Sequence, residues 1–423
     1  MKKVAVVFWV MLFACAGNRQ VSVTQNEKSL QNLQQDVAAE PDNVALRIQL
    51  GEAFRALQNH SAARDVFNQA LKIDPTSKAA LFGKGASLWH LGQRRAATEV
   101  FYAMLDDSAA TEFHPAIARL VGCPYKVTRI SDGIADNAYP SVSPDGESML
   151  FQSNRTGNWD IFLLELWTGD LQQLTFDRKR DEAPVFSPDG QSFAFTTTRD
   201  DSIYKRLEDS IREIYLGRFD GSPVQRLTNN FADDWAPVFG PKGDFILFLS
   251  DRDMTDTGRT TFTQIFRFDL NTRTVWRETD TPAKKNLGDV SPLHAQIYFS
   301  ESVDDEFQIF SKKLGPFRSQ QIATYEGKNV GVKCSADGAS LVFFSMRDQN
   351  YDIFMMDLRS LQVVQLTAHP NVDANPVFAP DSKAVYFHSN REGRYQIYRI
   401  DLTSPSSSRE VKAALAELGD LES

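Results

Sequence analysis

A short phrase that recurs six times after residue 138 constrains the fold of this chain more than any other feature. Its clearest copies, Tyr139–Gly146 and Ala183–Gly190, read YPSVSPDG and APVFSPDG. Looser copies lie at Ala236–Gly243, Asp289–Pro292, Lys333–Gly338 and Asn375–Asp381. Proline early in a turn with Asp-Gly behind it is typical of a tight connection between two strands. Each copy therefore predicts a pair of neighbouring strands.

The strands that follow the phrase repeat with a fixed period. An apolar run after each copy ends at Arg155, Arg199, Arg252, Val303, Arg347 or Arg391, at successive spacings of 44, 53, 51, 44 and 44 residues. The next apolar run reaches Ile161, Ile214, Ile265, Ile309, Ile353 or Ile397 after 6, 15, 13, 6, 6 and 6 residues. The long spacings therefore reflect insertions of 9 and 7 residues in a 44-residue period. Six such four-stranded units predict a six-bladed β-propeller over residues 125–404.

The ends of this region predict how the ring closes. No copy of a fourth strand follows Leu402, whereas a strand-like run, Tyr125–Ile130, precedes the first unit. We expect this run to complete the sixth blade beside Gln396–Leu402, because pairing there removes an open sheet edge.

A second, helical period of 34 residues occupies the chain before the propeller. Leu50, Gly51, Phe54 and Phe67 belong to a first unit, and Gly85, Leu88, Ala97, Phe101 and Met104 to a second. The pattern resembles the tetratricopeptide repeat, whose concave groove holds peptides. Four packed helices without that function are the alternative. The fold class is thus an α+β multidomain protein, with a tetratricopeptide-like (TPR-like) helical domain over 42–110, a connector over 111–124 and an all-β propeller.

The first residues predict export from the cytoplasm. Lys2 and Lys3 precede an apolar run, Val4–Ala14, that is too short to span a bilayer and is typical of a signal peptide over 1–14. Leu12–Cys15 resembles a bacterial lipobox, which implies lipidation of Cys15 and, with Ala16 next, an outer-membrane anchor facing the periplasm. An ordinary signal peptide is the alternative. The Gln- and Asn-rich residues 15–41 predict a flexible tether with a short helix at Ser29–Ala39.

The propeller motifs resemble those of a known family. Ser-Pro-Asp-Gly at Ser143–Gly146, Ser-Asn-Arg at Ser153–Arg155 and Asp-Ile-Phe at Asp160–Phe162 are similar to the repeat of TolB, the propeller of the Tol–Pal envelope system. The resemblance implies an envelope role. TolB begins with an α/β domain, whereas this chain has helical repeats, so the resemblance implies envelope scaffolding rather than one specific partner.

Composition and motifs argue against several kinds of chemistry. The net charge of −9 and pI near 5.3 disfavour nucleic-acid binding. The six histidines lack metal-ligand spacing, so we expect no metal and no cofactor. No Gly-x-Ser-x-Gly motif occurs, and the tail over 405–423, with a helical apolar face at Val411 and Leu415, is short, so we expect no enzyme activity. Cys123 and Cys334 are expected to be free.

Two sets of residues are candidates for binding a partner. Three positions before the proline of each phrase lies a polar residue, and the six would ring one channel mouth: Asn137, Asp181, Asp234, Lys285, Asn329 and Asp373. A turn-forming role is the alternative to binding a cation or a basic segment. Both insertions, Asp200–Arg212 and Asp253–Phe262, fall on the same face, near Trp235. The candidate partner-binding residues are Asp181, Tyr204, Lys205, Arg206, Asp234, Trp235 and Asp373.

The sequence also predicts structural ion pairs, one per blade, between the second and third strands: Arg155 with Asp160, Arg199 with Glu213, and Arg347 with Asp352. Taken together, the sequence predicts a non-enzymatic, lipid-anchored envelope scaffold that binds proteins or peptides through the propeller face and the helical groove. The alternative is a periplasmic receptor for a small ligand or glycan, with a polar pocket around Asp181, Asp234 and Asp373.

Overall fold

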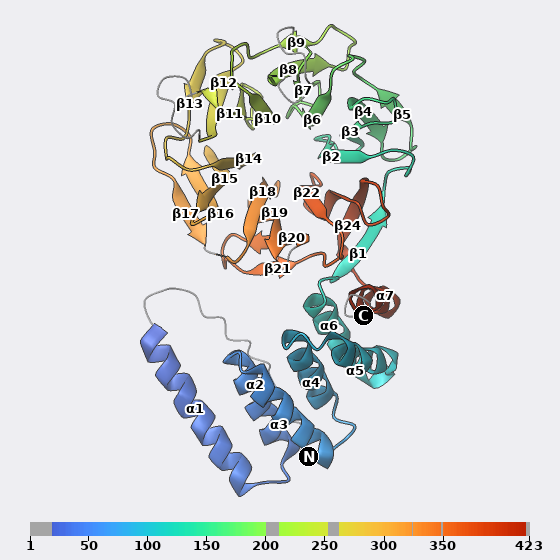
Figure 1. The fold of residues 1–423 in the computed structure, drawn as a ribbon, viewed down its shortest axis with the longest axis vertical. Helices are drawn as coiled ribbons and strands as arrows, with labels where there is room; N and C mark the ends of the chain where they lie inside the picture. The colour runs from blue at the N-terminus through green and yellow to red at the C-terminus, as the bar shows by residue number, and fades with distance from the viewer. Residues whose placement is uncertain (1–18, 200–210, 253–261, 324, 348–349, 420–423) are drawn as a thin grey trace. The chain divides into compact units, whose positions relative to one another are not determined.

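The computed structural model describes residues 19–199, 211–252, 262–323, 325–347 and 350–419, and it divides the chain into two compact units (Figure 1). One unit ends at Ile117, and the other spans Ala118–Leu418. The predicted leader, Cys15, and the loop residues Tyr204, Lys205 and Arg206 lie outside the described residues. Of the helices that are described, none is long and apolar enough to cross a membrane.

The helices of the first unit confirm the 34-residue repeat. They are α1 Arg19–Ala39, α2 Val44–Ala56, α3 His60–Ile73, α4 Lys78–His90, α5 Arg94–Asp106, the 3-10 helix η1 Ser108–Phe113 and α6 His114–Leu120. The side chains of Asn43, Asn59 and Ser77 each accept a hydrogen bond from a backbone N–H in the first turn of α2, α3 and α4. Helices α2 and α4 begin 34 residues apart, and so do α3 and α5, so each pair occupies matching positions in the repeat.

The glycines of this unit make room for a buried phenylalanine. Phe67 on α3 is fully buried, and a Cβ on Gly51 of α2 or Gly83 of α4 would lie 2.6 or 2.3 Å from its ring. Gly85 has the same relation to Phe101, at 2.5 Å. Small residues therefore let the helices approach closely enough to enclose the rings.

Two helices replace segments that were predicted to be irregular. Helix α1 covers Arg19–Ala39, so the predicted tether is largely helical and the helix begins ten residues before the predicted Ser29. No glycine or proline interrupts that stretch, and its Gln and Lys residues favour a helix. The predicted connector 111–124 holds the end of η1 and all of α6. Pro115 does not prevent α6, because it occupies the first turn, where its missing N–H has no intrahelical partner.

The second unit is a ring of six four-stranded antiparallel sheets, which confirms the predicted propeller (Figure 1). In order from the innermost strand, the sheets consist of β2 Asn137–Val142, β3 Ser148–Ser153, β4 Asp160–Glu165 and β5 Leu171–Gln173; β6 Asp181–Phe186, β7 Ser192–Thr197, β8 Glu213–Arg218 and β9 Gln225–Arg226; β10 Asp234–Phe239, β11 Phe245–Ser250, β12 Gln264–Asp269 and β13 Val275–Arg277; β14 Lys285–Val290, β15 Gln296–Val303, β16 Glu306–Lys313 and β17 Gln320–Ala323; β18 Lys328–Cys334, β19 Ser340–Arg347, β20 Asn350–Asp357 and β21 Val363–Gln365; β22 Asp373–Phe378, β23 Ala384–Ser389, β24 Gln396–Pro405 and β1 Tyr125–Arg129. Buried Phe, Ile and Leu side chains of the second and third strands fill the space between blades.

The ring closes as the sequence predicts. Strand β1 pairs antiparallel with β24, with Lys126 opposite Asp401 and Arg129 opposite Tyr398. The outermost strand of the last blade thus comes from the start of the propeller, and the sixth sheet is completed by a segment distant in sequence.

Helix α7 (Ser408–Gly419) follows the last strand. Val411 and Leu415 on its apolar face are fully buried, and Glu417 lies 3.5 Å from the imidazole of His369 in the connector before β22. The apolar face predicted at Val411 and Leu415 is therefore packed against the protein.

Candidate functional site

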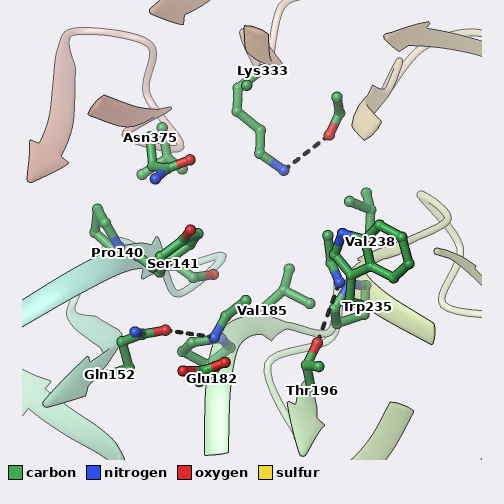
Figure 2. Close-up of a pocket in the computed structure, with 18 of the residues that line it drawn as sticks. Pro140, Ser141, Gln152, Glu182, Val185, Thr196, Trp235, Val238, Lys333 and Asn375 are labelled. Atoms are coloured by element: carbon green, nitrogen blue, oxygen red, sulfur yellow. Dashed lines mark hydrogen bonds between the residues drawn. The ribbon is translucent and has the colours of Figure 1, made fainter. Parts of the chain in front are cut away.

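A cavity of about 340 Å³ occupies the channel at the centre of the propeller (Figure 2). The innermost strands of all six blades line it, and four of them contribute the proline of the phrase and its neighbours. A cavity of this size accommodates a small organic ligand.

A backbone irregularity in each innermost strand shapes the wall of the channel. The pairing register with the second strand shifts at this point in every blade. Four blades place a non-glycine residue there with positive φ, directly before proline: Tyr139 (55°), Ala183 (51°), Ala236 (54°) and Asn375 (49°). The fifth blade places Gly331 there, with φ of 63°. This conformation is unfavourable for a side chain by roughly 1–2 kcal/mol, so the strain recurs around the channel.

At four of these bulges, a side chain of the adjacent blade accepts a hydrogen bond from the backbone N–H. Gln152 accepts from Ala183 N–H at 2.9 Å, and Thr196 accepts from Ala236 N–H at 3.2 Å (Figure 2). His388 Nδ1 accepts from Tyr139 N–H at 3.3 Å. Burial lowers the pKa of His388 to about 4, which keeps the imidazole neutral and able to accept. These bonds therefore join blade to blade around the channel.

The three acidic residues of the predicted ring at the channel mouth are not available to a partner. Asp181, Asp234 and Asp373 are fully buried. Each pairs with the arginine eighteen residues later in its own blade: Arg199 at 2.6 Å, Arg252 at 2.6 Å and Arg391 at 2.9 Å. The arginine follows the end of the second strand and reaches back to the start of the first. The carboxylates therefore serve the blades themselves, as in the structural alternative.

The other blades vary this arrangement. In the first, Arg155 donates to Asn137 at 3.2 Å and pairs with Asp132 at 2.9 Å. In the fourth, the charges are exchanged, since Lys285 stands at the ring position and pairs with Glu301 at 3.3 Å. In these blades, the residue that begins the innermost strand is therefore polar because it makes a hydrogen bond or ion pair inside its own blade.

The predicted pairs between the second and third strands are also wrong for the first two blades. Glu213 pairs with Arg226 at 2.9 Å rather than with Arg199, and Asp160 accepts from Thr156 at 2.7 Å rather than pairing with Arg155. The arginines turn toward the first strand instead. In the fifth blade, Asp352 accepts a hydrogen bond from Gln365 at 3.3 Å, and burial raises its pKa to about 8.

The residues that face the cavity either follow the buried polar residue that begins the strand, as Glu182 follows Asp181, or lie after the bulge, as Lys333 does. Trp235, a predicted partner-binding residue, lies half-buried on the cavity wall, and the Arg212 guanidinium lies 4.5 Å above its ring. Arg212 also pairs with Asp233 at 2.8 Å. Glu182 and Lys333 face the cavity as well (Figure 2).

The sequence analysis missed Tyr139, Glu182, Arg212 and Lys333. A signal was present in the phrase, because the residue after the predicted ring position lines the cavity in three blades, at Glu182, Trp235 and Asn286. The acidic residues at the ring position itself are buried within their blades. The alternation of side chains along a strand indicates that neighbouring residues point to opposite faces. Only the contact with the arginine shows which residue points into the blade and which points into the channel.

The described cysteines form no disulfide, and the described residues form no cluster of potential metal ligands. Cys123 and Cys334 are free and half-buried, and burial raises the pKa of each to about 12. In the described part of the chain, no three His, Cys, Asp or Glu side chains lie close enough to hold a metal ion together.

Family comparisons agree with both units. A family described as "TolB beta propeller domain" matches residues 304–414, and a family described as "Tetratricopeptide repeat" matches residues 44–87. A TolB homolog of Chlorobium luteolum is 37% identical over 140 residues, covering 25% of this chain and 32% of that protein. An uncharacterized protein of Agrobacterium fabrum is 33% identical over 118 residues, covering 28% of this chain and 37% of that protein. The chain therefore spans only about a third of the length of these relatives.

Solved propellers of different activities are similar to this chain. TolB of Acinetobacter baumannii shares 20% identity at a TM-score of 0.46, covering 70% of this chain and 69% of that one. Oligogalacturonate lyase of Vibrio parahaemolyticus shares 13% identity at a TM-score of 0.48, covering 66% of this chain and 93% of that one. From the two family matches and the six closed blades, the chain carries a TolB-like β-propeller domain preceded by a tetratricopeptide repeat.

Proposed function

We propose that this protein is a non-enzymatic cell-envelope lipoprotein that acts as an interaction scaffold. Its propeller face and its helical repeats would each engage envelope proteins or peptides, in a role like that of the Tol–Pal system. Repeat units of the tetratricopeptide type commonly serve as binding surfaces, which supports this proposal. The basic and apolar leader and Cys15 support an outer-membrane lipid anchor that faces the periplasm.

The observation that carries the proposal is a set of exposed apolar side chains on one face of the propeller. Ile134, Phe176 and Phe231 are 73%, 75% and 87% exposed. They lie in the connectors that lead to β2, β6 and β10, the innermost strands of three consecutive blades. Antiparallel alternation places all these connectors on the same face, which is also the face of the connector before Trp235. Large exposed apolar side chains gathered on one face mark an interaction surface.

The charges beside this surface indicate the chemistry of the partner. Arg178 and Arg180 are exposed and Lys179 is half-buried, directly after Phe176. A protein surface with an apolar centre and acidic residues around it would complement this arrangement. We therefore assign the face to an envelope protein of that kind, rather than to a nucleic acid or a lipid.

The experiment compares two faces of the same propeller. A photo-crosslinking amino acid replaces Phe231 or, as a control, Trp167, which is 96% exposed in the turn between β4 and β5 on the opposite face. Full-length protein expressed in its native envelope should crosslink to one defined partner from position 231 only. The double variant Phe176→Ala and Phe231→Ala should lose that partner without a change in melting temperature, because both rings are exposed. Equal crosslinking from both faces, or capture that survives the double variant, would refute the assignment.

The lipid anchor has a separate test. Cys15→Ala should abolish labelling by a fatty-acid probe and release the protein from the membrane fraction, whereas the crosslinking partner should still bind. Unchanged fractionation of this variant would contradict the anchor.

A second candidate function is a periplasmic receptor for a small ligand or glycan. The cavity in the channel favours it, because the cavity presents aromatic and charged side chains together.

A further inference from the structure

Two oppositely charged side chains line the channel cavity, and neither makes an ion pair with a described residue. Glu182 is half-buried on the wall of the second blade and makes no hydrogen bond or ion pair with any described residue. Lys333 is half-buried on the wall of the fifth blade, where its Nζ donates to the carbonyl oxygen of Gly288 at 3.1 Å (Figure 2). No described carboxylate lies within ion-pair distance of that ammonium group. Partly buried charges without partners are costly unless a ligand completes them.

The two charges face each other across the channel. The second and fifth blades stand three positions apart in a ring of six, and Figure 2 shows Glu182 and Lys333 on opposite sides of the cavity. Arg180 and, more weakly, Arg212 favour the charged form of Glu182, but neither makes an ion pair with it, and the Arg212 guanidinium is paired with Asp233. The cavity therefore presents an anion on one side and a cation on the other, each without an ion-pair partner among the described residues.

Aromatic residues of the two neighbouring blades line the cavity together with Glu182. Tyr139 belongs to the innermost strand of the blade before Glu182, and Trp235 to that of the blade after it, and both line the cavity. Burial raises the pKa of Tyr139, and the charge of Glu182 raises it further, so the two side chains interact. A carboxylate that shares a cavity with aromatic rings suits an ammonium group, which both charge and ring faces attract. The lone ammonium of Lys333 suits a carboxylate.

We propose that this cavity binds a small zwitterion, a free amino acid or short peptide, with its ammonium group on Glu182 and its carboxylate on Lys333. A dianion would be repelled by Glu182, and a simple cation would leave Lys333 without a partner. The volume of about 340 Å³ is within the range for a small ligand. The site is independent of the protein-binding face, and either assignment can fail without the other.

The experiment measures binding of defined probes to the whole protein by calorimetry. Alanine, Ala-Ala and Ala-Ala-Ala test which length spans the channel, while the N-acetyl and C-terminal amide forms of each remove one charge at a time. At least one zwitterion should bind, and its two blocked forms should bind at least tenfold more weakly. Failure of all three zwitterions to bind, or equal binding of the blocked forms, would overturn the proposal.

Two variants assign the charges to their residues. Glu182→Gln should weaken binding of the zwitterion at least tenfold and abolish the preference for a free amino group, while Lys333→Met should abolish the preference for a free carboxylate. The matched controls Glu147→Gln and Lys383→Met alter exposed residues of turns on the opposite face and should bind as the wild type does. Melting curves check that each variant is folded, and a folded variant at either channel position that binds normally overturns the assignment.

Discussion

A buried histidine that accepts a backbone hydrogen bond makes the stability of the propeller depend on pH in a predictable direction. His388 is buried in β23, where Nδ1 accepts from the N–H of Tyr139. Gln152 occupies the equivalent place in the first blade and accepts from Ala183. The substitution His388→Gln therefore keeps an acceptor of a kind that the fold already uses, and it removes only the titrating ring.

The expected magnitude follows from the pKa of the imidazole in the two states. Burial lowers the pKa of His388 from 6.5 to about 4 in the folded protein. As the pH falls below 6.5, the unfolded chain takes up a proton that the folded chain refuses until about pH 4. Stability is therefore lost as the pH falls between these values. At roughly 1.4 kcal/mol per pKa unit, the loss between pH 7.5 and 4.5 is about 2.5 kcal/mol.

The assay is urea-induced unfolding of the propeller, followed by near-UV circular dichroism, at pH 7.5 and 4.5. The wild type should lose about 2.5 kcal/mol more than His388→Gln between the two values, since all other titrating groups are common to both proteins. Stability curves that run parallel in the two proteins would refute the reasoning, because they would mean that the imidazole titrates equally in both states.

Three further substitutions test other contacts. Gly83→Ala should destabilise the helical unit by about 1–3 kcal/mol despite its better helix propensity, because the new Cβ would lie 2.3 Å from the buried ring of Phe67; a higher thermal midpoint would contradict this. Arg252→Met should cost the propeller about 3–5 kcal/mol by leaving Asp234 buried without its cation, and Asp234→Asn in the same chain should restore part of that loss in urea titrations. Burial raises the pKa of Asp352 to about 8, so its cost to stability appears as the pH rises from about 4 to 8. Asp352→Asn should therefore stabilise the protein at pH 8 by at least about 1.4 kcal/mol and have little effect at pH 4, and the opposite trend in denaturation midpoints would exclude a buried neutral acid.

The architecture could be predicted from the sequence because its signals are local and repeated. Each Pro-Asp-Gly-type turn connects strands that are adjacent in the chain, and the fixed spacing to the next apolar run gives the number of blades. The pairing of Tyr125–Arg129 with β24 was predictable for a different reason. The last unit has no fourth strand of its own, whereas one extra strand precedes the first unit. Turn chemistry does not show whether an Asn- and Gln-rich stretch remains irregular, and α1 was underestimated for that reason.

The roles of the polar residues were harder to predict, because the sequence contained both partners but not their pairing. The acidic residue that begins the first strand and the arginine after the second strand both recur with the period of the blade. Arginine has a long side chain, so pairing with the third strand was as compatible with the spacing as pairing with the first. The structure brings Arg199 to Asp181 at 2.6 Å, and this contact turns the predicted channel residues into the interior of the blades.

Residues of the innermost strands differ in whether they recur in the blades or occur in one blade only. In the blades whose contacts are described above, the polar residue at the start of the innermost strand, such as Asp181, pairs with a residue of its own blade, so it stabilises the propeller itself. The position of Glu182 is occupied elsewhere by Ala138, Trp235, Asn286, Val330 and Ala374, and that of Lys333 by Ser141, Val185, Val238, Asp289 and Val377. Neither charge is required by the repeat, and neither makes an ion pair with a described residue. A repeated fold gains nothing from two such charges facing each other across its axis, so their placement is better explained by a ligand than by the architecture.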